Sequence, residues 1–155
     1  IIYRYGDEKE SRKISNAILD SYKDGKISNT IDLAEVIKKS KTRFPKKIHP
    51  ATKTFQALRI YLNDEINNLR TGLKQSKDLI KTGGRIVCIS FHSLEDRSVK
   101  QSFAPKKISY PKEIPLNNEV IEEFKVIAKK IKPSASELQR NKRSRSAIMR
   151  VFEKI

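Results

Sequence analysis

The stretch that most constrains the fold is GGRIVCISF, residues 83–91, where the apolar spacing changes from helical to extended. Four apolar residues follow one another at 86–89, which is typical of a β-strand covered on both faces in a parallel sheet between helices. We expect this strand at about 85–91. Two more strands are expected at about 124–131 and 146–152, and the moderate loop between them favours antiparallel pairing. The chain is therefore expected to have an α/β fold.

Apolar residues recur at helical spacing in the region before this strand. The first helix is expected to end at Gly25 and to hold acidic residues in its first turn, where the helix dipole favours negative charge. These acids are Asp7, Glu8 and Glu10. A second helix should begin at Asn29 or Thr30, because either side chain can cap its free N–H groups.

The longest helical pattern opens after His49 and Pro50 and runs for about five turns. Its apolar residues are Phe55, Leu58, Leu62, Ile66, Leu69 and Leu73. The pattern predicts one long helix with these side chains in the core, and Gly72 is the expected point of any break.

The segment after the buried strand predicts a helix over residues 93–103, in which Ser93 and Asp96 have the spacing of a capping box. Ser134 and Glu137 have the same spacing, which predicts a short helical turn. Three prolines argue against regular structure in the intervening loop. They are Pro105, Pro111 and Pro115.

Charge is the most informative feature of the composition. The 155 residues include 34 Lys and Arg against 18 Asp and Glu, a formal net charge of +16. Such a field attracts polyanions, although solvation of ordinary surfaces is the alternative explanation. Two acid-free basic stretches stand out, KKSKTRFPKK at 38–47 and RNKRSRSAIMR at 140–150.

Other composition features exclude several classes of protein. No apolar run approaches the roughly 18 residues of a membrane span, and the opening residues resemble no signal peptide, so we expect a cytoplasmic location without a membrane partner. One cysteine, Cys88, cannot form an internal disulfide, and two scattered histidines make a metal site unexpected.

The stretch SFHSLEDR, residues 90–97, contains nucleophile, base and carboxylate types within eight residues. Adjacent residues do not converge as a catalytic triad, and the G-x-S-x-G elbow of hydrolases is absent. Three interpretations of His92 remain open: a structural residue, a group in a substrate pocket, and a hydrolytic base. The carboxyl end of a strand is where open α/β sheets bind ligands, which favours the pocket over the base.

Three separated motifs resemble one family. They are HPATKTFQALRIYLNDEINNL, LIKTGGRIVCISFHSLEDRSVKQSF and KPSASELQRNKRSRSAIMRVFEKI, preceded by YRYGDEKESRKISNAI near the start. Together they resemble the bacterial family that methylates N4 of a cytidine in 16S ribosomal RNA, called MraW or RsmH. The resemblance implies the carboxyl-terminal portion of a class I, Rossmann-like, S-adenosylmethionine-dependent methyltransferase sheet with a helical insert. Residues 1–70 would be most of the insert, and residues 71–155 the last part of the methyltransferase domain.

The resemblance also implies site residues and a partner, the 16S ribosomal RNA of the small subunit. Candidate substrate contacts in the insert are His49, Thr52, Lys53 and Arg59. Candidate contacts to the RNA backbone are Lys142, Arg143 and Arg145. Candidates near the expected catalytic pocket are His92, Ser93 and Asp96.

The sequence departs from the family pattern in its glycines. Only five are present, and none forms the G-x-G of a loop that approaches a cofactor closely. We therefore expect the S-adenosylmethionine site to belong mostly to an absent amino-terminal half, with no cofactor-binding residue in this chain. The chain alone is expected to be inactive. A non-enzymatic basic RNA-binding module is the alternative, and a serine hydrolase is a weaker one.

Overall fold

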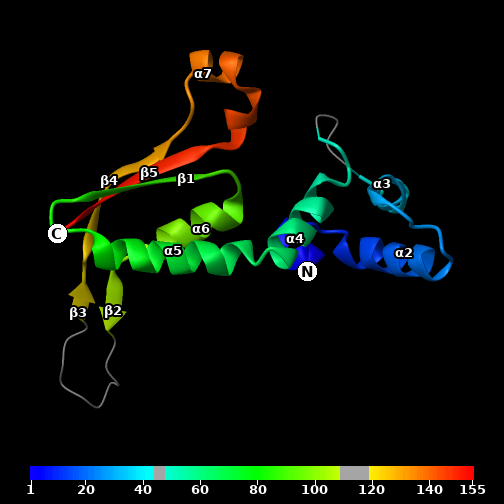
Figure 1. Ribbon diagram of the computed structural model, residues 1–155, viewed down its shortest axis with the longest axis horizontal. Coiled ribbons are helices and arrows are strands. Elements are labelled where there is room, and N and C mark those ends of the chain that lie inside the picture. The colour runs from blue at the N-terminus through cyan, green and yellow to red at the C-terminus, as the bar shows by residue number, and fades with distance from the viewer. Residues whose placement is uncertain (44–47, 109–118) are drawn as a thin grey trace. The chain divides into compact units, whose positions relative to one another are not determined.

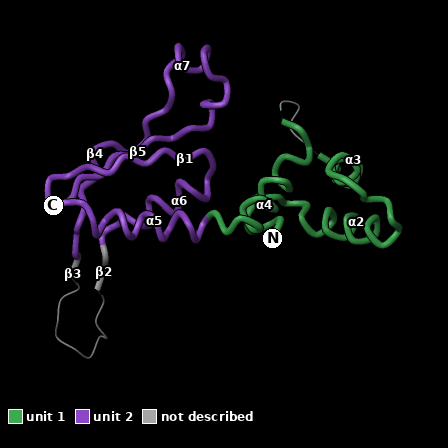
Figure 2. Tube along the Cα trace, viewed as in Figure 1, with its two compact units in different colours: residues 1–65 green, residues 66–155 purple. Residues whose placement is uncertain are grey.

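The computed structural model describes residues 1–43, 48–108 and 119–155. The chain divides into two compact units, residues 1–65 and 66–155, which Figure 2 shows in different colours. The division of the chain into a helical insert and a methyltransferase domain at residue 70 remains a prediction. Two prolines of the expected loop, Pro111 and Pro115, lie outside the described residues, as do residues 44–47 of the first basic stretch.

Unit 1 is helical. Its elements are α1 (Ile2–Gly6), α2 (Ser11–Lys23), α3 (Thr30–Ser40) and α4 (Thr52–Leu62) (Figure 1). Its core cluster consists of Ile2, Ile14, Ile37 and Ala51. The predicted cap of the second helix is confirmed, because Asn29 Oδ1 accepts hydrogen bonds from the backbone N–H groups of Ile31 (2.8 Å) and Asp32 (3.0 Å).

The predicted position of the acidic residues in the first turn of a helix is wrong. Helix α2 begins at Ser11, after all three of them. Asp7 ends α1 in the left-handed conformation (φ 47°). Glu8 is buried and pairs with Lys41 Nζ at 2.6 Å, and the Glu10 carboxylate accepts the N–H of Thr42. The partners of the two glutamates lie more than 30 residues away, beyond the range of a local sequence pattern.

The predicted single long helix is broken, but not at Gly72. The chain turns at Asn63 and Asp64, where Asp64 adopts φ 50°, and α5 (Glu65–Leu79) then runs through Gly72. Aspartate tolerates the left-handed region better than most residues, which permits this break. Leu62, just before the turn, is exposed, so its predicted core position is also wrong, whereas Phe55 packs against the core of unit 1.

Unit 2 contains a three-stranded sheet in the order β1 (Arg85–Ser90), β5 (Ile148–Lys154), β4 (Phe124–Ile131). Both strand pairs are antiparallel, so β1 and β4 point the same way. The predicted antiparallel pairing of the last two strands is confirmed. The last strand starts two residues later than predicted, because a 3₁₀ helix, η1 (Lys142–Ser146), occupies the expected start.

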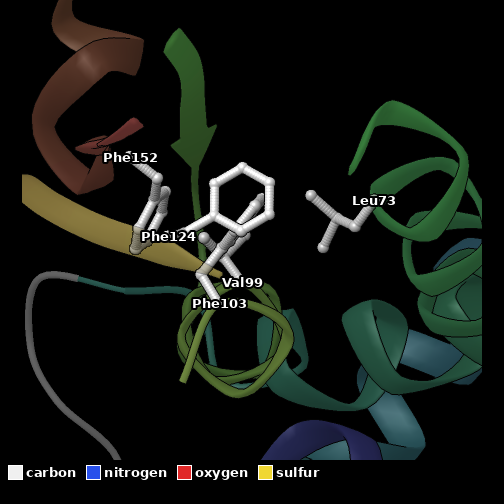
Figure 3. Packing of buried hydrophobic residues seen from close by; sticks show 5 residues of the cluster. All are labelled: Leu73, Val99, Phe103, Phe124 and Phe152. Carbon is white, nitrogen blue, oxygen red and sulfur yellow. The ribbon is translucent and has the colours of Figure 1, made fainter. Parts of the chain in front are cut away.

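One face of the sheet packs on α5 and α6 (Ser93–Ser102), which lie on the same side of it in Figure 1. The core between them is Leu73, Val99, Phe103, Phe124 and Phe152, shown in Figure 3. Phe103 stacks on Phe152 with ring centroids 4.1 Å apart. This arrangement joins both helices to β4 and β5 through aromatic packing.

The expectation that β1 is covered on both faces is wrong for the described residues. Side chains alternate along the strand, so Ile86 and Cys88 pack against the core while Val87 and Ile89 are 56% and 58% exposed. The consecutive apolar run therefore leaves an apolar outer face on β1. The predicted parallel sheet is corrected as well, since among the described strands β1 pairs with β5 alone, and that pairing is antiparallel.

A short hairpin and a short helix complete the described part of unit 2. A hairpin of β2 (Lys106–Ile108) and β3 (Glu119–Ile121) was not predicted, because the prolines nearby argue against strands. The predicted second cap is confirmed: the Glu137 N–H donates to Ser134 Oγ at 3.2 Å, at the start of α7 (Ala135–Arg140).

Candidate functional site

The turn from β1 into α6 brings the SFHSLEDR residues to the carboxyl end of β1. Ser90 is buried, and its hydroxyl donates to the Ile148 carbonyl oxygen on β5 at 3.3 Å. Phe91 follows with its side chain 53% exposed. Ser90 therefore supports the strand pair, and Phe91 presents its aromatic ring to solvent.

His92, not Ser93, caps α6, and its capping-box partner is Glu95, not Asp96. The Glu95 N–H donates to His92 Nδ1 (3.4 Å), and Glu95 Oε2 accepts the N–H groups of Phe91 (2.6 Å) and His92 (3.2 Å). Burial raises the pKa of Glu95, but the adjacent His92 ring and the hydrogen bond from the Phe91 N–H outweigh it, so the pKa lies below its ordinary value. The box is a reciprocal cap with an ionised glutamate.

Asp96 forms a buried ion pair with Arg150. Arg150 Nε donates to Asp96 Oδ1 at 2.6 Å and Nη2 to Oδ2 at 3.0 Å, and the guanidinium also donates to the Lys129 carbonyl oxygen. The hydrogen bonds from Arg150 are the main cause that holds the pKa of Asp96 below its ordinary value, with a smaller effect of Lys100. Asp96 thus connects α6 to both β5 and β4.

These contacts favour the structural interpretation of the cluster. Both ring nitrogens of His92 face Glu95, since Nε2 lies 3.3 Å from Glu95 Oε1 without hydrogen-bond geometry. This orientation places the His92 ring at the start of α6, where it caps the helix. Ser93 is the exposed first residue of α6. Catalytic roles for His92, Ser93 and Asp96 remain predictions.

A hollow of about 320 Å³ lies beside this turn, within unit 2. It is bounded by the ends of β1 and β4, by α7 and η1, and by the start of β5. Its apolar lining is Ile89, Phe91, Ile131, Pro133, Ala147 and Met149. Its polar lining is Lys132, Glu137, Asn141 and Ser144. A concave, mostly apolar site with a few polar groups is the usual form of a ligand pocket.

The predicted backbone-binding residues lie on η1, next to this hollow. Lys142, Arg143 and Arg145 are exposed, and none of them forms an ion pair among the residues that the structure describes. Asn141 caps η1 by accepting the Arg143 N–H at 3.1 Å, and Ser144 between the basic residues is buried. The short 3₁₀ helix therefore holds its cations outward around a fixed polar turn.

The predicted substrate contacts in unit 1 gather at α4 and just before it. The Ala51 N–H donates to His49 Nδ1 (3.2 Å), and exposed Thr52 begins the helix. Lys53 Nζ donates to the Asp7 carbonyl oxygen (3.0 Å). Arg59 makes a bidentate pair with Glu65 (2.7 and 3.0 Å). The four residues therefore lie along α4 or just before it, and His49, Lys53 and Arg59 contact neighbouring groups. Their substrate role remains a prediction.

The Gly83–Gly84 turn has both of its N–H groups occupied within the chain. The adjacent pair Gly83 and Gly84 makes the turn into β1, and its N–H groups are used by the Lys154 and Lys81 carbonyl oxygens (2.8 and 2.9 Å). No group of three or more His, Cys, Asp or Glu suited to a metal ion occurs within residues 1–43, 48–108 and 119–155. Over the same residues, none of the helices has the length and apolar character needed to cross a membrane.

Sequence reasoning missed three residues that organise this end of unit 2. Glu95 completes the cap, Arg150 holds Asp96, and Phe91 lines the hollow. The Glu95 role had a local signal, since glutamate three residues after His92 also has capping-box spacing. Arg150 had no local signal, because its partner lies 54 residues away.

The chain matches the MraW methylase family over residues 1–155. Curated relatives named "Ribosomal RNA small subunit methyltransferase H" include one from Legionella pneumophila (strain Paris), 43% identical over 154 residues, with 97% of this chain and 50% of the relative covered.

Two further relatives with the same name are similarly close. One from Buchnera aphidicola subsp. Cinara cedri is 44% identical over 159 residues, with 99% of this chain and 52% of the relative covered. One from Neorickettsia sennetsu is 45% identical over 159 residues, with 100% and 48% covered. The chain therefore spans about half the length of the curated relatives it matches.

Proposed function

Since the chain belongs to the MraW methylase family, we propose that it is the part of a ribosomal RNA small-subunit methyltransferase that contacts the RNA. The observation that carries this proposal is the family match over all of residues 1–155, supported by relatives of that name at 43–45% identity. Because the chain spans about half of those relatives, the methyl transfer is proposed for a whole protein of this family.

The proposed reaction is methylation of N4 of a cytidine in 16S ribosomal RNA. S-adenosylmethionine, when bound, supplies the methyl group. The backbone N–H groups of Gly83 and Gly84 are occupied within the chain, so we assign the cofactor site to the length of the relatives that this chain does not span. We further propose that β1, β4 and β5 are strands five, six and seven of a class I methyltransferase sheet. Two features support this assignment. Helices cover one face of the sheet, and β1 and β4 run in the same direction on either side of β5, which runs the opposite way.

The part of the reaction proposed for this chain is to bind and orient RNA. An exocyclic cytosine amine is a poor nucleophile because its lone pair is delocalised into the ring, so the base has to be extruded and aligned. The net charge of +16 and three exposed cations of η1 support a role in holding the RNA backbone: Lys142, Arg143 and Arg145.

Unit 1 is proposed to add contacts to the substrate through α4. Lys53 and Arg59 are exposed, and their present partners are a backbone carbonyl oxygen and a glutamate. A phosphate oxygen can replace the carbonyl oxygen at Lys53, because an ammonium group binds an anion more strongly than a neutral acceptor. At Arg59 a phosphate would compete with the Glu65 carboxylate as a second bidentate acceptor. His49 and Thr52 are proposed to contact sugar or base from the start of the same helix.

A chimaera tests this function. The chain replaces the corresponding half of the Legionella pneumophila relative, and small subunits that lack the modification receive the chimaera, the whole relative, or the chain alone. Labelled methyl incorporation and nucleoside mass spectrometry then locate the product. We expect N4-methylcytidine from the chimaera and the relative and none from the chain alone. A folded chimaera that binds the cofactor and leaves the subunits unmethylated contradicts the proposal, as does methylation by the chain alone.

A non-enzymatic RNA-binding module is the second candidate, favoured by the outward cations of η1. The two functions differ in their response to S-adenosylmethionine. RNA binding by the chimaera that is strongly salt dependent, unaffected by the cofactor and never followed by methyl transfer would support the module.

A further inference from the structure

The hollow beside Phe91 has an apolar floor with an exposed aromatic ring at its edge. Phe91 is 53% exposed, and Ile89 and Met149 line the same space from neighbouring strands. Its volume of about 320 Å³ lies at the lower end of the range for small-molecule sites. The shape and lining suit a flat, weakly polar group that can stack on a ring.

Three of the four polar residues that line the hollow already have partners within the chain: Glu137, Asn141 and Ser144. The Ser144 hydroxyl donates to the Asn141 carbonyl oxygen (2.7 Å), and Asn141 Oδ1 accepts the Arg143 N–H. Glu137 Oε2 lies 3.5 Å from Arg140 Nη2. With these partners satisfied, the hollow can hold a ring through stacking and apolar contact, but it offers few groups that distinguish one base from another.

Basic side chains surround the hollow. Lys132 lines it, and η1 beside it carries Lys142, Arg143 and Arg145, none of which is ion-paired within the described residues. The single carboxylate of the lining, Glu137, faces Arg140. An apolar floor with a cationic rim is the complement of a nucleotide in a single strand, whose base is flat and whose phosphates are negative.

We propose that this hollow holds one unstacked base of single-stranded RNA, with Phe91 as its stacking surface and the η1 cations on the adjacent phosphates. The site holds the strand without selecting the base, so it accepts a nucleotide next to the modified one and positions it. The inference rests on the proposed function in taking RNA as the ligand. A protein segment covering the same apolar floor is the competing occupant, and an unchanged RNA affinity of the Phe91→Ala variant would favour it.

The test measures binding of fluorescent single-stranded 12-mers of uridine, cytidine or adenosine, and of a duplex of equal length, by fluorescence anisotropy. The variants are Phe91→Ala, Phe91→Tyr and the control Tyr22→Ala, which removes an aromatic ring that is 71% exposed on α2. Phe91→Ala is expected to weaken single-strand binding roughly ten-fold for all three sequences, with an unchanged salt slope. Phe91→Tyr is expected to restore it, and duplex binding should not change. Circular dichroism checks that each variant is folded.

Three outcomes overturn the inference. Phe91→Ala with wild-type affinity, or with an equal loss on single strands and duplex, removes the stacking site and leaves a protein segment as the occupant of the hollow. A loss of affinity for only one of the three sequences shows that the hollow selects a particular base, which contradicts a site that holds any base. Absence of salt-dependent RNA binding by the unaltered chain removes the inference and its premise together. If either of the first two occurs while the chimaera methylates small subunits, the proposed function stands without this site.

Discussion

Asp96 and Arg150 form a buried bidentate ion pair, Nε to Oδ1 at 2.6 Å and Nη2 to Oδ2 at 3.0 Å, between the first turn of α6 and β5. The pair fixes where α6 starts and therefore where the turn carrying Phe91 and His92 lies. Because Arg150 also donates to the Lys129 carbonyl oxygen, one side chain connects the helix to two strands.

Removal of Arg150 should destabilise unit 2 strongly. Arg150→Met leaves the Asp96 carboxylate buried without its partner, and the expected loss is about 3–5 kcal/mol in the free energy of unfolding. The matched control is Lys100→Met, which removes an exposed cation 3.6 Å from the same carboxylate and should cost less than about 1 kcal/mol. Urea denaturation followed by circular dichroism measures both.

The double variant Asp96→Leu with Arg150→Met separates a lost pair from an isolated charge. Replacing both charges by apolar groups should recover much of the loss, because no buried charge is left unpaired. Equal midpoints for Arg150→Met and Lys100→Met would contradict this account of the pair.

The same pair predicts an acid-dependent stability. The pKa of Asp96 is lowered from its ordinary 3.8 in the folded chain, so the unfolded chain binds more protons as pH falls. The stabilisation is complete above the unfolded pKa and is lost as pH falls through the lower folded pKa. Urea midpoints should therefore fall below about pH 4 in the unaltered chain, and Asp96→Asn should flatten this fall.

Glu95 provides the comparison for this pH dependence. Its pKa is also lowered, from 4.5, so Glu95→Gln should remove a separate part of the same acid-side fall and leave the part due to Asp96. If Asp96→Asn and the unaltered chain show the same pH dependence, the low pKa of Asp96 is not what links its ion pair to stability.

Substitutions of His92 can distinguish its capping role from a catalytic role. His92→Ala removes the acceptor for the Glu95 N–H and should cost about 1 kcal/mol, whereas His92→Asn keeps a good capping acceptor and should restore stability. We expect methyl transfer by the chimaera to follow the same order. A His92→Asn chimaera that is stable, binds RNA and fails to methylate would instead assign His92 to the chemistry, with Ser93→Ala as the neighbouring control.

Local patterns predicted the elements whose stabilising contacts are local. The Asn29 and Ser134 caps, and the antiparallel pairing of β4 with β5, followed from residues within a few positions or one loop. The helix break at Asn63 and Asp64 was hard to predict, because neither residue forbids a helix. Gly72 was the more obvious helix breaker in the sequence, yet it lies inside α5.

The site was less predictable because its contacts are distant in sequence. Asp96 reads locally as a capping residue, and only its approach to Arg150 makes it an ion-pair partner. Phe91 reads as the end of a buried strand, and its exposure depends on the fold around α7 and η1. The basic run at η1 was visible in the sequence. The hollow beside it was not, because its lining comes from strands that are distant in sequence.

The η1 cations should contribute to RNA affinity through counterion release. Lys142→Ala, Arg143→Ala and Arg145→Ala should each lower the slope of log affinity against log salt by about 1 and weaken binding for all sequences alike. Lys125→Ala is the control, because its ammonium already pairs with Glu153 at 2.8 Å. Binding titrations from about 50 to 200 mM salt test this. Slopes that do not change in the three η1 variants would place the RNA backbone elsewhere.

Two glycines in helices should respond oppositely to alanine. A Cβ on Gly6 of α1 would lie 2.7 Å from the Lys53 carbonyl oxygen and 3.3 Å from Ala57 Cβ, whereas a Cβ on Gly72 meets nothing within 4 Å. Gly6→Ala should therefore separate α1 from α4 and cost about 1–3 kcal/mol, while Gly72→Ala should gain about 0.5–1 kcal/mol by reducing the freedom of the unfolded chain.

Tyrosine fluorescence can assign the first effect to unit 1, because four of the five tyrosines lie there: Tyr3, Tyr5, Tyr22 and Tyr61. The Gly6→Ala loss should appear in this signal, and the Gly72→Ala gain in circular dichroism, which also reports unit 2. A stable Gly6→Ala chain would mean that α1 and α4 do not need their close approach.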